Sequence, residues 1–342
     1  MKRLLRLWWL PGLALQAMAL VLAARFGAVP VLGSDWLAPW QGPASDELPG
    51  SAWVLWHLRV PRMLFALLIG ALLGLCGALA QALFRNPLAD PGLLGVSNGA
   101  ACAAAMCIVV LGSLNAEWLQ AWRIWLLPAA AFAGAFGICL LLDRVARWLT
   151  PGSVSGLLLT GVALNALTAA LIGLCTYLAN DEQLRSLSFW TLGSLAGGGW
   201  LQLASLLPLL LLAGWRVARL CQPLNALTLG VDAARQVGID VVRLRGEVIL
   251  LVALLCGVAA AWCGMIGFIG LMAPHLVRLC VGADQRLVLP GSAWLGGLLL
   301  LLADTLARSV AQPAEMPVGI FTALIGAPFF LLLLSRSQGR LG

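Results

Sequence analysis

Ten long apolar blocks dominate this sequence and limit what it can fold into. They cover, approximately, residues 5–25, 62–84, 93–111, 123–143, 155–178, 200–219, 246–263, 268–281, 290–307 and 317–335. A helix that crosses a bilayer needs about 20 mostly apolar residues, and in lipid only helices or closed barrels satisfy their own backbone hydrogen bonds. The blocks lack the period-two alternation of barrel strands. The sequence therefore predicts an all-α membrane protein with about ten transmembrane helices.

The composition excludes a soluble globular protein. Of the 342 residues, 61% are hydrophobic and only 10% are charged, whereas soluble domains carry about 25% charged residues. The first apolar block is longer than the 7 to 15 apolar residues typical of a secretory signal. We therefore expect it to be retained as the first span of a single integral membrane domain over residues 1–342.

The distribution of basic residues predicts the orientation in the membrane. With the N-terminus inside, 15 of the 21 lysines and arginines lie in cytoplasmic segments, and six lie on the other side: Arg25, Arg59, Arg62, Arg123, Arg185 and Arg308. Positive residues concentrate in cytoplasmic loops, so both termini are expected in the cytoplasm. This bias accounts for the net charge of +7. No basic tract is left over that would indicate nucleic-acid binding.

The nine cysteines do not indicate a metal site. No two of them form a C-x-x-C pair, and nearly all lie inside apolar blocks. A free cysteine in such a place behaves as a small hydrophobic residue, whereas zinc sites need ligands clustered at short spacing. We expect no metal or other cofactor bound by this chain.

One polar segment, residues 224–245 (LNALTLGVDAARQVGIDVVRLR), stands apart from the apolar blocks. Asp232 can pair with Arg235 or Gln236 at helical spacing, and Gly230 and Gly238 are natural breaks between two short helices. Plain connections usually run about 4 to 6 residues. The segment therefore indicates a cytoplasmic docking element, with a solvated loop as the alternative.

The stretch GVDAARQVG resembles the coupling segment of ABC importer permeases, which sits in a cleft of an ATPase subunit. The resemblance continues through RVPR at 59–62, RNPLADPGLLGVSNGA at 85–100, GFIGLMAPHLVRL at 267–279, LADTLAR at 302–308 and AEMPVGIFTALIGAPFF at 314–330. Together these ordered motifs resemble the FecCD-type permeases for iron-siderophores, haem and cobalamin. The resemblance implies the type II ABC importer permease fold in a bacterial inner membrane.

The resemblance also implies the partners. These are a second copy of the chain, two ATP-binding cassette ATPase subunits and a periplasmic substrate-binding protein. The coupling helices would lie at about 222–245, and the residues implied for ATPase contact are Leu229, Gly230, Asp232, Ala233, Ala234, Arg235 and Gly238. One position departs from the family pattern, because Val231 stands where the family usually has an acidic residue.

An independent observation places ATP hydrolysis on another subunit. A phosphate-binding P-loop needs the pattern G-x-x-x-x-G-K-[ST], and the only lysine of this chain is Lys2. ATP and Mg²⁺ are therefore expected on the partner ATPase. We predict a transport subunit and no enzyme.

The segment 85–100 is expected to form a tight cytoplasmic corner. Pro87 and Pro91 break the chain after the second span, while Asn86 and Asp90 can satisfy the freed backbone groups. Resemblance to the family places this corner beside the cytoplasmic gate, for which it implies Asn86, Pro87, Leu88, Ser153 and Ser155. A purely structural role needs the same residue types and stays open.

Arg59, Arg62 and Arg308 are exceptions to the positive-inside bias, since all three fall at outer ends of spans. In the family, the arginines of RVPR and of LADTLAR receive acidic residues of the periplasmic binding protein. Charge pairs of this kind mainly guide orientation and association rate. Snorkelling to lipid headgroups is the alternative.

Two other functional classes fit this sequence less well. GVSNG at 95–99 matches the G-x-S-x-G of serine hydrolases, but the only histidines are His57 and His275, and neither has an evident carboxylate partner. An ion-coupled transporter would need ionisable residues near the midplane. Asp304 is nearly alone there, and its spacing to Arg308 favours a structural ion pair.

The ligand is predicted from the outer segment 176–195 (TYLANDEQLRSLSFWTLGSL), which resembles the haem-importing branch of the family more than the cobalamin branch. Haem is a flat apolar ring with two propionates, and Arg185 could meet a propionate while Phe189 offers ring contact. Trp190 and Tyr177 complete the predicted pathway. An ion pair of Arg185 with Asp181 or Glu182 is the competing interpretation. Ferric siderophores and then cobalamin are the alternative ligands.

Overall fold

A computed structural model describes residues 2–27, 29–38, 50–113, 117–151, 153–311 and 314–338 of the chain. All ten predicted spans are helices. They are α1 (Lys2–Arg25), α3 (Val60–Phe84), α4 (Val96–Ser113), α5 (Glu117–Leu149), α6 (Val154–Leu178), α8 (Trp200–Leu229), α10 (Val241–Cys263), α11 (Ile269–Val281), α12 (Gln285–Val310) and α13 (Val318–Gln338).

Shorter elements connect these helices. They are η1 (Gly33–Trp36), α2 (Gly50–Val54), the π-helical turn η3 (Leu55–Arg59), η4 (Pro91–Leu94), α7 (Asp181–Leu192) and α9 (Val231–Gln236). Because α2 and η3 run directly into α3, one continuous helix covers Gly50–Phe84. Among the described residues, six helices are long and apolar enough to cross a membrane, and four further apolar helices are shorter. The prediction of an all-α, multi-span membrane protein is confirmed.

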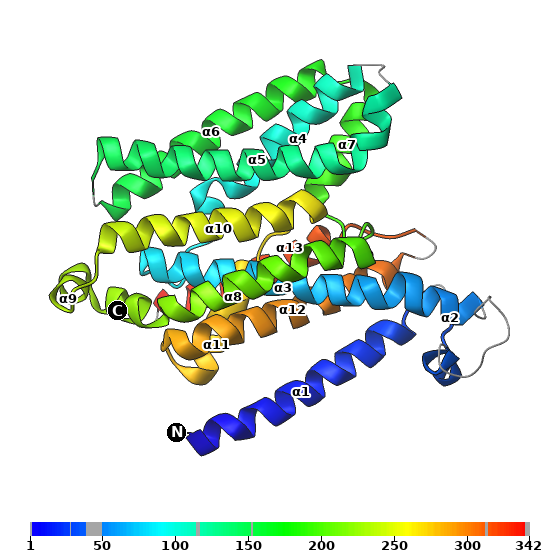
Figure 1. Cartoon of the computed structure of the whole chain (residues 1–342), viewed down its shortest axis with the longest axis horizontal. Helices are drawn as coiled ribbons and strands as arrows, with labels where there is room; N and C mark the ends of the chain where they lie inside the picture. The colour runs from blue at the N-terminus through cyan, green and yellow to red at the C-terminus, as the bar shows by residue number, and fades with distance from the viewer. Residues whose placement is uncertain are drawn as a thin grey trace.

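The helices lie roughly side by side, with α3 in the middle of the bundle (Figure 1). Helix α3 packs against α8, α10, α11 and α12, and most of its side chains are buried. Helices α4, α5 and α6 form a layer on one side, with α5 packed against α10. Helix α1 lies on the opposite side of the bundle, and its N-terminal end stands away from it (Figure 1).

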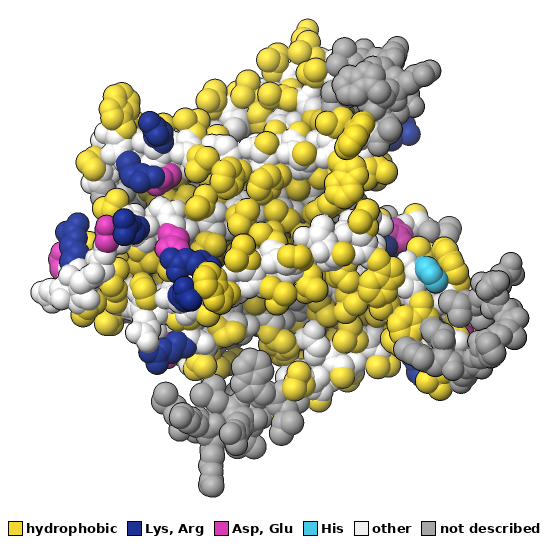
Figure 2. Space-filling view, viewed as in Figure 1, with side chains coloured by type: hydrophobic (Ala, Val, Ile, Leu, Met, Phe, Trp, Pro, Cys, Tyr) yellow, Lys and Arg dark blue, Asp and Glu magenta, His cyan; other side chains and the backbone are white. Residues whose placement is uncertain are grey.

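The two ends of the bundle differ in charge. Lysine and arginine side chains gather at the end that carries α9, while the long faces of the helices are apolar (Figure 2). Helices α2 and α7 lie at the other end (Figure 1). Lipid contact requires apolar faces, and the positive-inside bias gives one end its excess of basic residues. Both features follow from the sequence pattern.

A row of glycines on α3 lets this central helix approach its neighbours closely. A Cβ added to Gly70 would meet the backbone of Gly296, one added to Gly74 would meet the carbonyl of Ser292, and one added to Gly77 would meet the carbonyl of Gly270. In membrane bundles, small residues of this kind permit close van der Waals packing between helices. The position of α3 therefore depends on having no side chain at these points.

Replacing Gly77 with alanine is expected to lower the stability of the chain by about 1–3 kcal/mol, the usual range for overpacking. The physical reason is that backbone, not a flexible side chain, occupies the space of the new methyl group. The measurement is the thermal unfolding midpoint in detergent. Gly137→Ala on α5 is the matched control, because nothing lies within 4 Å of its added Cβ. Equal midpoints for the two variants would contradict this account of the packing.

Candidate functional site

The predicted coupling segment forms the outermost part of the charged end. Helix α8 ends at Gly230, whose φ is +135°, and Gly238, whose φ is +82°, follows α9. Such positive φ values favour glycine, which has no Cβ. Both predicted breaks are confirmed. The carboxylate of Asp240 then accepts hydrogen bonds from the backbone of Val242 and Arg243 and so caps α10.

The segment contains one short helix between two long ones, where two short helices were predicted. Buried Leu220, Leu224 and Leu227 continue the apolar face of α8 against the bundle almost to the end of the helix at Leu229. Because these leucines recur at helical spacing, α8 continues through the start of the polar segment at residue 224, where a separate short helix was expected. Helix α9 lies outermost at this end of the bundle, beyond the end of α10 (Figure 1).

The surface of this end combines charge with exposed apolar groups. Asp232 and Arg235 lie 3.9 Å apart at i, i+3, as predicted, and Ala234 is buried beneath them. Leu229 is 82% exposed and Val237 is 67% exposed, one at each end of α9. Sequence reasoning missed Val237. The segment 224–245 contains several other apolar residues, so the sequence alone contains no signal that distinguishes Val237.

Two further contacts connect α9 to the rest of the bundle. Arg216 of α8 pairs with Glu247 of α10, so the two helices that carry α9 are held together. Asn225 donates to Asp284 at 2.7 Å and accepts from the backbone of Gln285 at 2.8 Å, which links the end of α8 to the start of α12.

The predicted corner between α3 and α4 has the expected hydrogen bonds. Asn86 accepts from the backbone of Leu88 at 2.9 Å, and Asp90 accepts from the backbone of Gly92 at 2.6 Å. Ser153 caps α6 by accepting from the backbone of Gly156 at 3.0 Å, and Ser155 lies in the first turn of that helix. The corner and α6 are in contact.

A pair of asparagines joins this corner to α6 and was missed by sequence reasoning. Asn98 donates to the side-chain oxygen of Asn165 at 3.0 Å, and Asn165 donates to the carbonyl of Gly92 at 3.3 Å. Amide side chains within apolar spans need partners of this kind. The signal available in the sequence was Asn165 itself, a polar residue inside the block 155–178.

At the opposite end, Arg62, Asp304, Arg308 and Glu315 form a network of ion pairs. Arg62 lies 2.9 Å from Asp304 and 2.7 Å from Glu315, and Arg308 lies 3.3 Å from Asp304. The predicted Asp304–Arg308 pair is therefore present. Asp304 is fully buried, so its charge depends on these two arginines.

Arg59 and Arg308 hold the end of α1. Arg59 donates to the carbonyl of Ala24 at 2.6 Å and to that of Val29, while Arg308 donates to the carbonyls of Ala23 and Phe26 at 2.5 and 3.1 Å. The last carbonyls of a helix lack partners within it, and cationic side chains there also interact favourably with the helix dipole. Arg59 is 6% exposed and Arg308 is 7% exposed. Neither guanidinium lies free on the surface, so docking by these residues stays a prediction.

The predicted outer mouth is built around α7. Asn180 and Gln183 form a capping box at its start, with bonds of 2.9 and 3.0 Å. Leu187 faces inward, while Arg185 and Phe189 are exposed and Tyr177 is exposed at the end of α6. Among the described residues, Arg185 forms no ion pair with Asp181 or Glu182. Trp190 packs partly against the core.

The histidines lie apart from the predicted serine motif. His57 stacks on Trp53 in the α2–η3 region, and His275 packs edge-on against Phe329. Ser97 is surrounded by Ile69, Leu73 and Cys256. Within the described ranges, no group of three histidine, cysteine or acidic residues is arranged to hold a metal ion.

Comparison with known proteins agrees with this geometry. Residues 15–336 match the FecCD transport family. The chain is 42% identical over 303 residues to the hemin transport permease HmuU of Yersinia pestis, covering 87% of each chain. It is also 42% identical over 334 residues to the vitamin B12 import permease BtuC of Salmonella typhi, covering 96% of this chain and 95% of that protein.

The fold has a solved counterpart. A metal-chelate type ABC transporter in an inward-facing conformation superposes with a TM-score of 0.82 at 31% identity, covering 96% of this chain and 98% of the other. The family match and these relatives each cover most of this chain. This chain therefore belongs to the FecCD transport family and is a permease subunit of an ABC importer.

Proposed function

We propose that this permease carries haem across the inner membrane. The exposed face of α7, at the outer end of the bundle, is the observation on which this proposal rests. The relatives include a hemin permease and vitamin B12 permeases at the same identity. The choice of ligand therefore depends on the chemistry of the outer mouth.

That chemistry suits an anionic, flat, apolar ligand. Arg185 and Phe189 are i and i+4 residues on α7, so their side chains project from neighbouring points of one helix face. The Arg185 guanidinium, which forms no ion pair with a carboxylate among the described residues, can form charge-assisted hydrogen bonds to a propionate. The exposed ring of Phe189 can contact the edge or face of a porphyrin. Tyr177 adds a second exposed ring nearby in sequence. Ferric siderophores and then cobalamin are the alternative ligands.

The partners in this proposal are a second copy of the chain, two ATPase subunits and a periplasmic binding protein. Leu229 and Val237 are exposed at the two ends of α9, and contact with an ATPase subunit at that end would remove both apolar side chains from water. With α9 in the cytoplasm, both termini also lie there. The excess of basic residues at that end supports this orientation.

The binding protein can dock at the outer arginines only by replacing groups that these arginines already bind. Arg62 already binds Asp304 and Glu315, and Arg59 and Arg308 already bind carbonyls of α1 and the segment after it. A partner carboxylate would have to replace one of these acceptors. Arg62 is the best placed, because its partner Glu315 is half-exposed.

The experiment is ATP-driven uptake into liposomes that contain the complete transporter. We expect haem uptake to exceed cobalamin uptake, and Arg185→Ala to lower haem uptake about tenfold, as loss of a charge-assisted hydrogen bond of about 1.5 kcal/mol would. Arg144→Ala, which removes an exposed arginine from the other end of the bundle, is the control. Transport of cobalamin or a siderophore without haem would overturn the ligand assignment and leave the permease assignment intact.

A further inference from the structure

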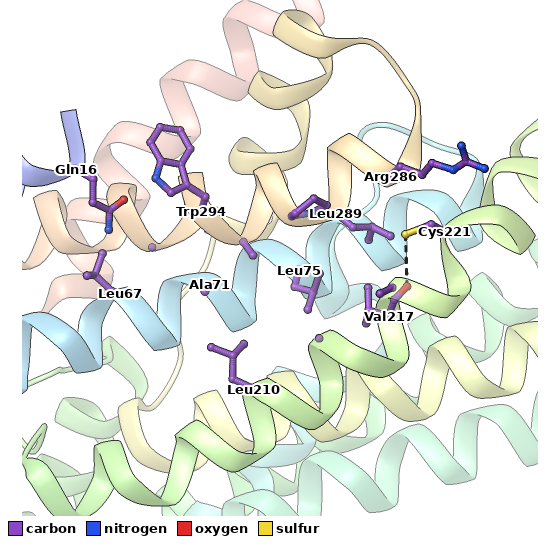
Figure 3. A pocket seen from close by; sticks show the side chains of 15 residues that line it. Gln16, Leu67, Ala71, Leu75, Leu210, Val217, Cys221, Arg286, Leu289 and Trp294 are labelled. Carbon is purple, nitrogen blue, oxygen red and sulfur yellow. Dashed lines mark hydrogen bonds between the residues drawn. The ribbon is translucent and has the colours of Figure 1, made fainter. Parts of the chain in front are cut away.

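An apolar groove runs along one outer face of the bundle, between α3, α8, α12 and α1 at Gln16. Its volume is about 480 Å³. Leu67, Ala71 and Leu75 of α3 form its floor, facing Leu210 of α8 and Leu289 of α12 (Figure 3). Every one of these side chains is a hydrocarbon, so the groove suits a chain of methylene groups.

The length of the groove corresponds to one leaflet of a bilayer. Along α12 its lining extends from Arg286 to Gly297, which is about 16 Å at the helical rise of 1.5 Å per residue. The hydrocarbon core of a bilayer is about 30 Å thick. Since α12 begins at the α9 end of the bundle, the groove runs from that membrane surface to about the midplane.

A single positive charge stands at the surface end of this groove. Arg286 lies at one end of the lining and Gln16 at the other (Figure 3). The Arg286 side chain is exposed and forms no ion pair among the described residues. The neighbouring Asp284 carboxylate accepts from Asn225 at 2.7 Å and from the backbone of Arg286 at 3.0 Å, and its negative charge also interacts with the Arg286 guanidinium without forming a contact ion pair.

A second groove provides an internal comparison. It lies on the other side of α1 and α12, has a volume of about 380 Å³ and shares Trp294 with the first. No charged residue is among its lining residues. Both grooves can take hydrocarbon, but among the described lining residues only the first groove includes a cation where a lipid phosphate would lie.

We propose that the groove between α3, α8 and α12 binds one acyl chain of an anionic phospholipid whose phosphate lies against Arg286. Because the acyl chain already lies in hydrocarbon, the groove adds van der Waals packing and no hydrophobic transfer energy, and the guanidinium provides the affinity for, and preference for, an anionic headgroup. The groove borders α8 and the Asn225–Asp284 contact. A bound lipid would therefore support the junction between the coupling end and α12. The identity of the leaflet as cytoplasmic rests on the proposed orientation.

The test uses the full transporter in nanodiscs that contain a phosphatidylglycerol with a photoreactive acyl chain. After illumination, cross-linked peptides are mapped by mass spectrometry. We expect adducts on α8 around Leu210–Val217 and on α12 around Leu289–Trp294, in higher yield than with the matching phosphatidylcholine. Arg286→Gln should lower the phosphatidylglycerol yield roughly fivefold, which corresponds to about 1 kcal/mol per basic residue at a membrane surface. Arg144→Gln, at the same end of the bundle, should leave it unchanged.

A second variant fills the groove. Nothing lies within 4 Å of a Cβ added to Gly214, which lines it, so Gly214→Leu should fold and abolish the adducts of both lipids on α8 and α12. Gly137→Leu on α5 is the matched control, since its Cβ is equally unobstructed. Equal yields for the two headgroups, or adducts unchanged by Arg286→Gln and Gly214→Leu, would overturn the proposal. Loss of the permease dimer in Gly214→Leu would overturn it as well, because the groove would then be an interface between copies.

Discussion

Replacing Asp304 with alanine is expected to destabilise the chain by about 3–5 kcal/mol, the usual effect of removing one partner from a buried ion pair. Asp304 has no exposed surface, and it is the carboxylate shared by Arg62 and Arg308. Without it, the buried Arg308 guanidinium loses its carboxylate partner and the partly buried Arg62 keeps only the exposed Glu315 among the described carboxylates, and desolvated charge is costly unless it is paired. The measurement is the thermal unfolding midpoint of the detergent-purified chain, together with the fraction that elutes as a single folded species.

Asp143→Ala serves as the control for this prediction. Asp143 also pairs with an arginine at i, i+4, but Arg147 is 57% exposed, and exposed pairs contribute about 0–1 kcal/mol. Replacing Arg62 and Asp304 together with leucine should recover part of the loss, because a hydrophobic substitute can stand in for a buried ion pair. An unfolding midpoint for Asp304→Ala that matches that of Asp143→Ala would refute the structural role of the network.

Leu229→Asp is expected to abolish ATP-driven uptake without changing the stability of the permease. Leu229 and Val237 are exposed on either side of α9, at the end that carries the basic residues (Figure 2). A carboxylate at the centre of an apolar contact with the ATPase is expected to weaken it by about 2 kcal/mol or more, the range of interface hot spots. This corresponds to roughly 30-fold weaker association. The amount of ATPase that copurifies with the tagged permease measures this association directly.

The comparison variant is Leu149→Asp, which changes an exposed leucine at the same end of the bundle on α5. It should leave copurification and uptake unchanged, because α5 is separated in sequence and structure from α9. Val237→Asp should reproduce the effect of Leu229→Asp. Normal copurification of the ATPase with both α9 variants would show that the coupling contact lies elsewhere.

Local patterns were sufficient to predict the helices and their breaks. The ten apolar blocks each became a helix because in lipid the backbone has no other donor or acceptor than its own chain. Gly230 and Gly238 ended α8 and α9 since only glycine adopts their φ values without strain. Asn86 and Asp90 satisfied backbone groups two residues away, an interaction set by sequence spacing alone.

The partners of the polar residues inside the bundle were decided by tertiary structure. Arg62 and Asp304 are 242 residues apart in the chain, and nothing in the local pattern of either helix indicates that they meet. The sequence placed Arg59 and Arg308 correctly at outer ends of spans, but only packing against α1 directs their guanidinium groups to its last carbonyls.

The sequence by itself thus determined the class, the number of spans and the family of this protein, because hydropathy, turn residues and motifs act over a few neighbouring positions. Tertiary structure alone decided the ion-pair network, the Asn98–Asn165 contact and the groove beside α12. The physical reason is that apolar residues surround most of these helices, so the sequence does not specify which face meets a neighbour. That choice is made by close packing at Gly70, Gly74 and Gly77, where the backbones touch.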